Sequence, residues 1–202
     1  MNTITYVYGD KIYLNLTNKC SNNCEFCIRR NNDGLLDYYL WLDKEPTADE
    51  VIADLEKYEL DKYDEAVFCG FGEPLYAIDV LIETADWLKA HGVKTRLNTN
   101  GQAGLISGPD TALKLKGRID TVSISLNASD AEKYQKICHC KFNEEGFFEM
   151  LRFAVQCKKE GIRAVLSVVD VIGEEEVEKC RKVAKNVGVD FRVRTYVPHY
   201  DE

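Results

Sequence analysis

Three cysteines, Cys20, Cys24 and Cys27, lie within one stretch of eight residues at the spacing Cys-x3-Cys-x2-Cys. Three thiolates can hold three irons of a [4Fe–4S] cluster, whereas ordinary cubane electron carriers use four cysteines. The next cysteine in the chain is Cys69, so the spacing leaves the fourth iron open to a ligand that is not part of the protein. The motif therefore predicts chemistry at an accessible iron rather than simple electron storage.

Two alternatives stay open on the spacing alone. Positions i, i+4 and i+7 also lie on one face of a helix, where the three cysteines would form a buried thiol cluster. The intervening Ser21, Asn22 and Asn23 favour turns and caps over helix interiors, which favours a loop wrapped around an ion. Zinc is the other alternative, but a structural zinc site normally closes with four ligands, and no histidine or fourth cysteine follows nearby.

The cysteine stretch, with the aromatic Phe26 directly before Cys27, resembles the cluster motif of the radical S-adenosylmethionine (SAM) superfamily. The resemblance implies that Cys20, Cys24 and Cys27 hold a [4Fe–4S] cluster whose open iron is chelated by the amino and carboxylate groups of SAM. It also implies that Phe26 lies beside the adenine of SAM. A ring in an ordinary hydrophobic core is the alternative for Phe26.

A second motif, Gly70-Phe71-Gly72-Glu73-Pro74, follows an expected strand about 40 residues after the cysteines. Glycine lets the backbone approach a ligand closely, and a carboxylate accepts a strong hydrogen bond from an ammonium group. The motif resembles the Gly-Gly-Glu-Pro motif of the same superfamily, which binds the amino group of SAM, with Phe71 in place of the usual first glycine. Gly70, Gly72, Glu73 and Pro74 are therefore candidate SAM contacts, and a plain turn is the alternative.

Polar side chains also end the later expected strands. Asn98 matches a family position that contacts the SAM ribose, and Ser125 and Asn127 share the parity of an inward-facing pair. By resemblance, these two are candidate contacts for the ribose and the carboxylate of SAM, whereas capping and turn chemistry is the alternative. The last two expected strands end with three candidates for substrate contact: Asp170, Arg194 and Tyr196. A structural salt bridge would explain Arg194 equally well.

The elements that must position these residues alternate about six times between strand and helix patterns. The expected strands are residues 11–17, 65–69, 94–99, 121–126, 164–171 and 191–197, and they are near-continuously apolar. The expected helices are residues 48–58, 77–90, 111–116, 130–138, 143–160 and 174–186. The alternation predicts an α/β fold with parallel strands joined by right-handed crossovers. Because a closed eight-fold barrel usually needs about 250 residues, we expect an open (β/α)6 partial TIM barrel, which is also the core fold of the radical SAM superfamily.

Composition sets the broad class. The chain has 202 residues with 45% hydrophobic and 30% charged residues, which predicts one soluble domain over residues 1–202. A net charge of −8 does not favour direct binding to nucleic acid. The chain shows neither a signal peptide pattern nor an apolar run of membrane-spanning length, so we expect a cytoplasmic protein with no membrane partner. In that reducing compartment, eight cysteines indicate a metal site rather than disulfides.

Other residues leave two interpretations each. In the loop expected at residues 28–45, the rings of Tyr38, Tyr39 and Trp41 either pin the loop to the core or form a lid. The basic residues around the cysteines are either solvated charges or a docking patch for an acidic electron donor: Lys19, Arg29 and Arg30. Cys157 and Cys180 fall in expected helices as core thiols, and the roles of Cys69, Cys138 and Cys140 stay open.

These observations predict a radical SAM enzyme. A one-electron donor such as flavodoxin or ferredoxin would reduce the cluster, and reductive cleavage of SAM would give a 5′-deoxyadenosyl radical that abstracts hydrogen from a small molecule, peptide or protein. No catalytic residue is assigned, because the cofactor carries the radical. Overall likeness, including residues 12–29 and 68–75, is greatest to the small radical SAM proteins associated with TatD-family nucleases. The alternatives are a glycyl-radical-enzyme activase, a 7-carboxy-7-deazaguanine synthase-like enzyme, and a non-catalytic iron–sulfur module for electron transfer or sensing.

Overall fold

The computed structural model describes residues 3–196, which are built around one seven-stranded sheet. Its strands are β1 (Thr5–Tyr8), β2 (Lys11–Leu14), β5 (Glu65–Phe68), β6 (Thr95–Thr99), β7 (Thr121–Ser125), β8 (Arg163–Val169) and β9 (Asp190–Arg194). The order across the sheet is β1-β2-β5-β6-β7-β8-β9. All neighbours from β2 to β9 run parallel, and β1 pairs antiparallel with β2.

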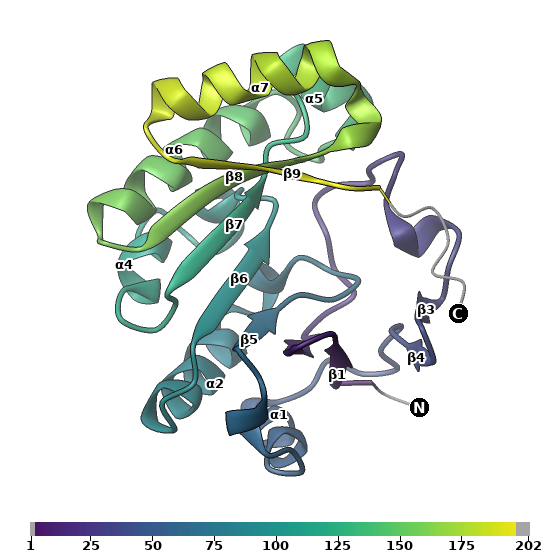
Figure 1. Ribbon diagram of the computed structural model, residues 1–202, viewed down its shortest axis with the longest axis vertical. Helices are drawn as coiled ribbons and strands as arrows, with labels where there is room; N and C mark the ends of the chain where they lie inside the picture. The colour runs from purple at the N-terminus through teal and green to yellow at the C-terminus, as the bar shows by residue number, and fades with distance from the viewer. Residues whose placement is uncertain (1–2, 197–202) are drawn as a thin grey trace.

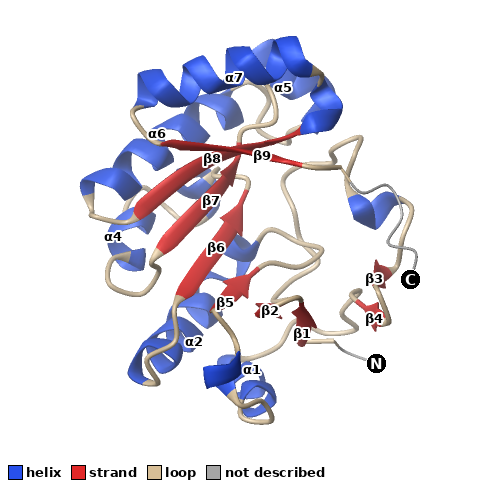
Figure 2. Cartoon of the chain, viewed as in Figure 1, coloured by secondary structure: helices blue, strands red, loops and turns tan. Residues whose placement is uncertain are grey.

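Helices cover one face of this sheet. They are α1 (Ala48–Leu55), α2 (Ile78–Ala90), α3 (Ala103–Ile106), α4 (Thr111–Leu115), α5 (Ala131–Cys138), α6 (Glu145–Lys159) and α7 (Glu174–Val187). Figure 1 shows α2, α4, α6 and α7 outside the curved sheet, whereas the purple N-terminal loops occupy its open side. Figure 2 shows that this open side is formed mainly by loops. The fold is thus the open partial barrel that the sequence predicts.

Local sequence explains where the helices begin and end. Helix α1 begins at a capping box, in which the Thr47 hydroxyl accepts from the Glu50 N–H at 3.2 Å and the Glu50 carboxylate accepts from the Thr47 N–H at 2.8 Å. Helix α7 has three glutamates in its first turn, where carboxylates suit the helix dipole. It ends at Gly188, whose φ of +75° is easily reached by glycine. These helices are therefore encoded by nearby residues.

All six predicted strands and all six predicted helices are present, with ends that differ by up to three residues. Residue 197 of the predicted last strand lies outside the described residues. The sequence analysis missed strand β1, helix α3 and the small hairpin of β3 (Gly34–Leu35) with β4 (Tyr38–Tyr39). Each of these elements is five residues or shorter, too short to show a clear period.

The expectation of near-continuously apolar strands is wrong for β6, β7 and β9. Along β6, the fully buried Leu97 alternates with the polar, half-buried Arg96 and Asn98. Strand β7 alternates in the same way, with Val122 and Ile124 toward the helices. The physical reason is that the barrel is open: helices cover only the outer face of the sheet, and the concave inner face keeps polar side chains.

A second, smaller hydrophobic cluster holds the loop after the cysteines. Its buried members are Tyr6, Leu35, Leu40 and Phe71. The Trp41 ring packs edge-on against Phe71 with 5.0 Å between ring centroids. The rings of this loop therefore pin it to the core, as one of the two interpretations predicts, although Tyr39 itself is exposed. The cluster also explains Phe71, because a glycine at this position would leave the cluster without its fourth buried side chain.

Candidate functional site

The segment with the three cysteines, here called the cysteine loop (residues 18–27), leaves β2 and crosses the carboxyl ends of the neighbouring strands (Figure 1). Its backbone pairs with the end of α5 and the residues that follow. The N–H groups of Asn23 and Glu25 donate to Cys138 O at 2.9 Å and Ile137 O at 3.0 Å, and the Lys141 N–H donates to Ser21 O at 2.7 Å. All three cysteines are partly buried rather than fully enclosed in the core.

A buried polar network fixes the turn residues of the cysteine loop. Gln102, which is 0% exposed, donates to Asn22 Oδ1 at 2.8 Å and accepts from the Ser21 hydroxyl at 2.6 Å. The Tyr134 hydroxyl lies 2.9 Å from Gln102 Nε2 and 2.8 Å from Asn22 Nδ2. Asn100 Nδ2 donates to Ser21 Oγ at 2.8 Å. This Gln102 network (Ser21, Asn22, Asn100, Gln102 and Tyr134) ties the loop to residues 79–112 positions away in the chain.

The two glycines of the second motif make close contact possible between loops. A Cβ at Gly70 would overlap Asn15 Oδ1, and a Cβ at Gly72 would overlap Thr17 O and lie 2.7 Å from Lys19 O. The Glu73 N–H donates to the same Lys19 O at 2.7 Å. Both glycines are therefore required where the motif meets the chain before Cys20. Whether they also contact SAM stays a prediction.

Glu73 is held by the protein itself. Its side chain is buried, and the carboxylate accepts from the Thr99 hydroxyl at 2.7 Å, the Leu75 N–H at 3.2 Å and the Asn100 N–H at 2.6 Å. Burial raises the pKa of Glu73 to about 7, although the hydrogen bonds oppose this shift. The carboxylate therefore positions the residues after β6, and any contact from this motif to an amino group would come from its backbone. Pro74 begins the short helix Pro74–Ala77.

Arg29 joins the two loops, a role that the sequence analysis did not find. Its guanidinium donates to Asn18 O at 3.3 Å, Asn22 O at 3.2 Å and Phe71 O at 3.2 Å. It is therefore neither simply solvated nor available as part of a docking patch. Arg30 is exposed, and Lys19 pairs with Glu45 at 2.9 Å.

The thiols are neutral without a bound cation. Burial, with a smaller contribution from Glu73, raises the pKa of Cys20 to about 12, and burial also raises the pKa of Cys27. A hydrogen bond with the Cys138 thiol and burial raise the pKa of Cys24. A metal centre binds thiolates, so it would displace these protons on binding. Among residues 3–196, no three His, Cys, Asp or Glu side chains converge at the spacing of a single metal ion.

A fourth thiol, that of Cys138, contacts the cysteine motif. Cys138, which is fully buried at the end of α5, lies against Cys24 and accepts from Asn127 Nδ2 at 3.8 Å. Cys140 is buried next to Gln102 and Gly146, away from the surface. The sequence separation of more than 110 residues between Cys24 and Cys138 hid this contact from motif analysis.

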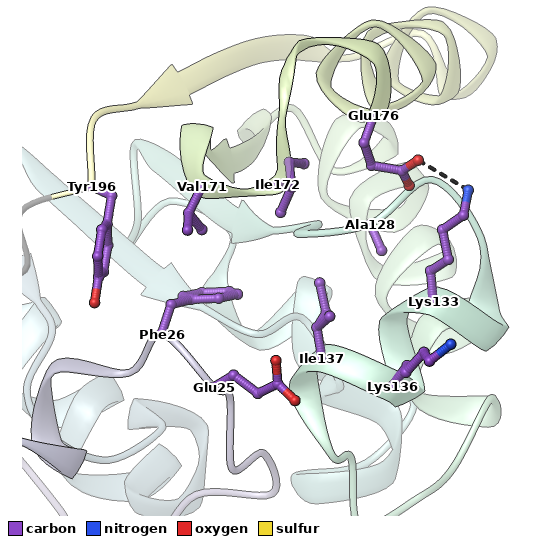
Figure 3. A pocket seen from close by; sticks show the side chains of 10 residues that line it. All are labelled: Glu25, Phe26, Ala128, Lys133, Lys136, Ile137, Val171, Ile172, Glu176 and Tyr196. Atoms are coloured by element: carbon purple, nitrogen blue, oxygen red, sulfur yellow. Dashed lines mark hydrogen bonds and ion pairs between the residues drawn. The ribbon is translucent and has the colours of Figure 1, made fainter.

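A cavity of about 430 Å³ lies beside the cysteine loop, a volume that suits a small molecule. Figure 3 shows the Phe26 ring extending into this cavity, with Val171, Ile172 and Ile137 around it. The polar rim includes Lys136 and the Lys133–Glu176 ion pair of 2.9 Å. Phe26 thus lines a ligand-sized space rather than an ordinary core.

The remaining predicted residues surround the strand ends. Asn98 and Asn127 each have a buried Oδ1 atom with no hydrogen-bond partner in the described part of the chain. A bound ligand with hydroxyl or ammonium donors would satisfy such acceptors. Asn127 adopts φ +58°, a conformation that asparagine tolerates better than most residues. Ser125 Oγ lies 3.5 Å from Arg194 Nη2, and Asp170 accepts from the Tyr196 N–H at 2.8 Å. Tyr196 lines the cavity.

The chain is similar to known proteins over most of its length. The sequence model of one protein family, the radical SAM superfamily, matches residues 14–187 of this chain. A protein of Methanocaldococcus jannaschii, provisionally named a glycyl-radical enzyme activating enzyme, is 25% identical over 189 residues, which cover 91% of this chain and 72% of that protein.

Two solved structures illustrate the likeness of fold. SuiB of Streptococcus suis bound to S-adenosylmethionine superposes with a TM-score of 0.73 at 17% identity, over 94% of this chain and 41% of SuiB. Native anSMEcpe with bound AdoMet has a TM-score of 0.69 at 18% identity, over 94% of this chain and 52% of that chain. This chain therefore spans about half of these structures or less, and at such identities the likeness concerns the fold.

We predict that Gln102→Ala lowers the free energy of unfolding by about 2–3 kcal/mol, because it leaves the buried Asn22 Oδ1 without a partner and removes one of the two hydrogen bonds of the Ser21 and Tyr134 hydroxyls. Urea denaturation monitored by circular dichroism measures the change. Gln156→Ala, on the half-buried side of α6, is the matched control and should cost less than about 1 kcal/mol. Equal effects of the two substitutions would show that the network does not anchor the loop.

The raised pKa of Glu73 predicts a pH dependence of stability. The folded chain keeps the Glu73 proton up to about pH 7, whereas the unfolded chain loses it near the ordinary glutamate pKa of 4.5. The free energy of unfolding therefore falls as pH rises between these values, by roughly 3 kcal/mol from this group. Glu73→Gln cannot titrate, so the wild-type minus variant difference should fall across this window and level off above it. Denaturation series from pH 4.5 to pH 8 measure this difference, and a constant difference would contradict the assignment.

Proposed function

Since this chain belongs to the radical SAM superfamily, whose members are enzymes that use a [4Fe–4S] cluster and SAM, we propose that Cys20, Cys24 and Cys27 hold the cluster and that the chain cleaves SAM reductively. When bound, the reduced cluster supplies the electron that converts SAM into methionine and a 5′-deoxyadenosyl radical, which abstracts hydrogen from a substrate. The observation that carries the proposal is the anchored cysteine loop beside a ligand-sized cavity lined by Phe26.

The described residues fit SAM in three ways. Phe26 presents an aromatic ring in the cavity, as expected of a side chain that lies against adenine. Asn98 and Asn127 supply acceptors for ribose hydroxyls or the methionyl ammonium group. The glycine motif supplies backbone groups beside the cysteine loop, with Glu73 and Pro74 shaping that backbone from behind. Ser125 lies at the same edge of the sheet, where its hydroxyl contacts Arg194, and is a further candidate contact for SAM.

An anaerobic assay of SAM cleavage tests this function. After cluster reconstitution and reduction, the wild-type chain should produce 5′-deoxyadenosine from SAM. Asn98→Ala should weaken SAM binding by about tenfold, the effect of losing one or two hydrogen bonds, while the visible iron–sulfur absorbance persists. A reconstituted wild-type chain that makes no 5′-deoxyadenosine would favour the electron-transfer or sensing module instead.

Single alanine substitutions count the cluster ligands. We expect Cys20→Ala, Cys24→Ala and Cys27→Ala each to lose most of the visible iron–sulfur absorbance and bound iron. Cys157→Ala and Cys180→Ala are the matched controls, because these thiols are buried in α6 and α7 away from the loop. Cys138→Ala is the informative variant, because Cys138 contacts Cys24. Cluster retention in Cys138→Ala agrees with three ligands and an open iron, whereas loss in this variant would indicate four protein ligands.

A second candidate function is activation of a glycyl-radical enzyme, which the M. jannaschii relative supports. In that case the substrate would be a protein backbone glycine. The appearance of a glycyl radical in a co-encoded partner, seen by electron paramagnetic resonance after SAM cleavage, would favour this candidate. The 7-carboxy-7-deazaguanine synthase-like alternative predicts turnover of a pterin instead.

We also propose a subgroup of the superfamily and an electron donor for this chain. Likeness over residues 12–29 and 68–75 supports the group of small radical SAM proteins associated with TatD-family nucleases. A flavodoxin or ferredoxin is the proposed electron donor, and the exposed Arg30 beside the cysteine loop suits an acidic protein of this kind. Within residues 3–196, no helix has the length and apolar character needed to cross a membrane.

A further inference from the structure

A second cavity, of about 460 Å³, lies on the concave face of the sheet near the amino ends of β5 to β9. We call it the arginine groove, because Arg96, Arg163 and Arg192 line it together with the acidic residues Glu65 and Asp190. Its position differs from that of the cavity beside Phe26, since Glu65, Arg163 and Asp190 are the first residues of their strands. Its lining is polar, as expected of the uncovered face of an open barrel.

The charges in the arginine groove do not balance. Arg96 pairs with Glu65 at 3.1 Å, and Arg163 pairs with Asp190 at 2.8 Å. Arg192 forms no ion pair or side-chain hydrogen bond with any residue in the described range 3–196. Three arginines against two carboxylates leave the groove with one positive charge in excess.

A hydrogen-bond donor in the groove also lacks an acceptor. The Arg96 side chain is only 11% exposed, and its Nε atom is buried without a partner among the described residues. Arg192 is exposed overall, but partial burial and the Arg96 charge lower its pKa, with Tyr13 and Glu65 opposing the shift. A buried donor without a protein partner is satisfied by an ordered water, an ion or a ligand. Guanidinium groups bind carboxylate and phosphate oxygens especially well.

The groove shares a wall with the site where the radical would form. Ser123 lines the groove, and Ser125, two residues further along β7, faces the same side at the carboxyl end of the strand. At about 3.3 Å per residue, the two positions are roughly 7 Å apart. A small molecule that spans this distance would have its reacting carbon at the strand ends while an acidic group lies between the arginines.

We propose that the arginine groove binds the phosphate or carboxylate group of an acidic small-molecule substrate through Arg96 and Arg192. Its identity as a substrate site rests on the proposed function, whereas the anion site itself rests on the groove alone. The proposal narrows the substrate class: an acidic small molecule fits the groove, and a protein glycine leaves its charge excess without a counter-ion.

Isothermal titration calorimetry of the cluster-reconstituted chain, with inorganic phosphate and acetate as separate probes in low-salt buffer, tests the site. We expect saturable binding of at least one anion, weakened tenfold or more in Arg192→Gln, the loss typical of one charge-assisted hydrogen-bond pair. Tighter binding of phosphate indicates a phosphorylated substrate, and tighter binding of acetate indicates a carboxylic acid. Arg192 is exposed on an edge strand, so the variant should fold, which its thermal melting curve verifies.

Arg181→Gln is the matched control. Its guanidinium lies 4.9 Å from the ring of Phe191, a groove-lining residue, and pairs with Glu178 on α7, so this variant loses the same charge beside β9 while every residue that lines the groove is kept. Anion affinity should change less than twofold in this control. Absence of saturable binding, or equal weakening in Arg192→Gln and Arg181→Gln, overturns the inference. Because binding is measured without SAM, failure of SAM cleavage with intact anion binding would refute only the proposed function, and the reverse result would refute only the groove.

Discussion

The arrangement of the site depends on the buried amide of Gln102. The cysteine loop has no helix or strand of its own between β2 and residue 27, so side chains from elsewhere must satisfy its buried polar groups. Gln102 and Tyr134 do this for Ser21 and Asn22, and Asn100 extends the network to Glu73. Inside a protein such bonds are strong when complete and costly when incomplete. The loop that carries the three thiols is therefore held by the residues after β6 and by helix α5 rather than by its own secondary structure.

The two faces of the sheet carry different kinds of side chain. Helices bury the apolar side chains of the outer face, including Leu97, Val122 and Leu166, and supply most of the hydrophobic stabilisation. The concave face carries arginine, asparagine and serine side chains, because no helix covers it. In parallel α/β folds, chemistry gathers where strands end, and here the cysteine loop closes that edge. The open barrel thus carries two separate cavities, the one beside Phe26 and the arginine groove.

The candidate SAM contacts from the sequence fall into two groups in this fold. Gly70, Gly72 and Glu73 read as ligand contacts in the sequence, yet the structure uses them to bring the motif against the cysteine loop and to hold the turn after β6. Asn98 and Asn127, which have weaker sequence signals, carry acceptors that lack protein partners. Residue types and their spacing restrict the possible chemistry, but the direction of each side chain decides whether it binds a ligand or another part of the protein.

The sequence by itself determined strand β2, strands β5 to β9, the longer helices and the cysteine motif, because each is encoded by residues close together in the chain. Capping residues, hydrophobic period and Cys-x3-Cys-x2-Cys spacing are local signals of that kind. Only the tertiary structure decided the roles of Gln102, Arg29 and Cys138, and the polarity of the concave face. These depend on contacts between residues tens of positions or more apart, and on which face the helices leave open. Such contacts form when the chain folds, so no short stretch of sequence records them.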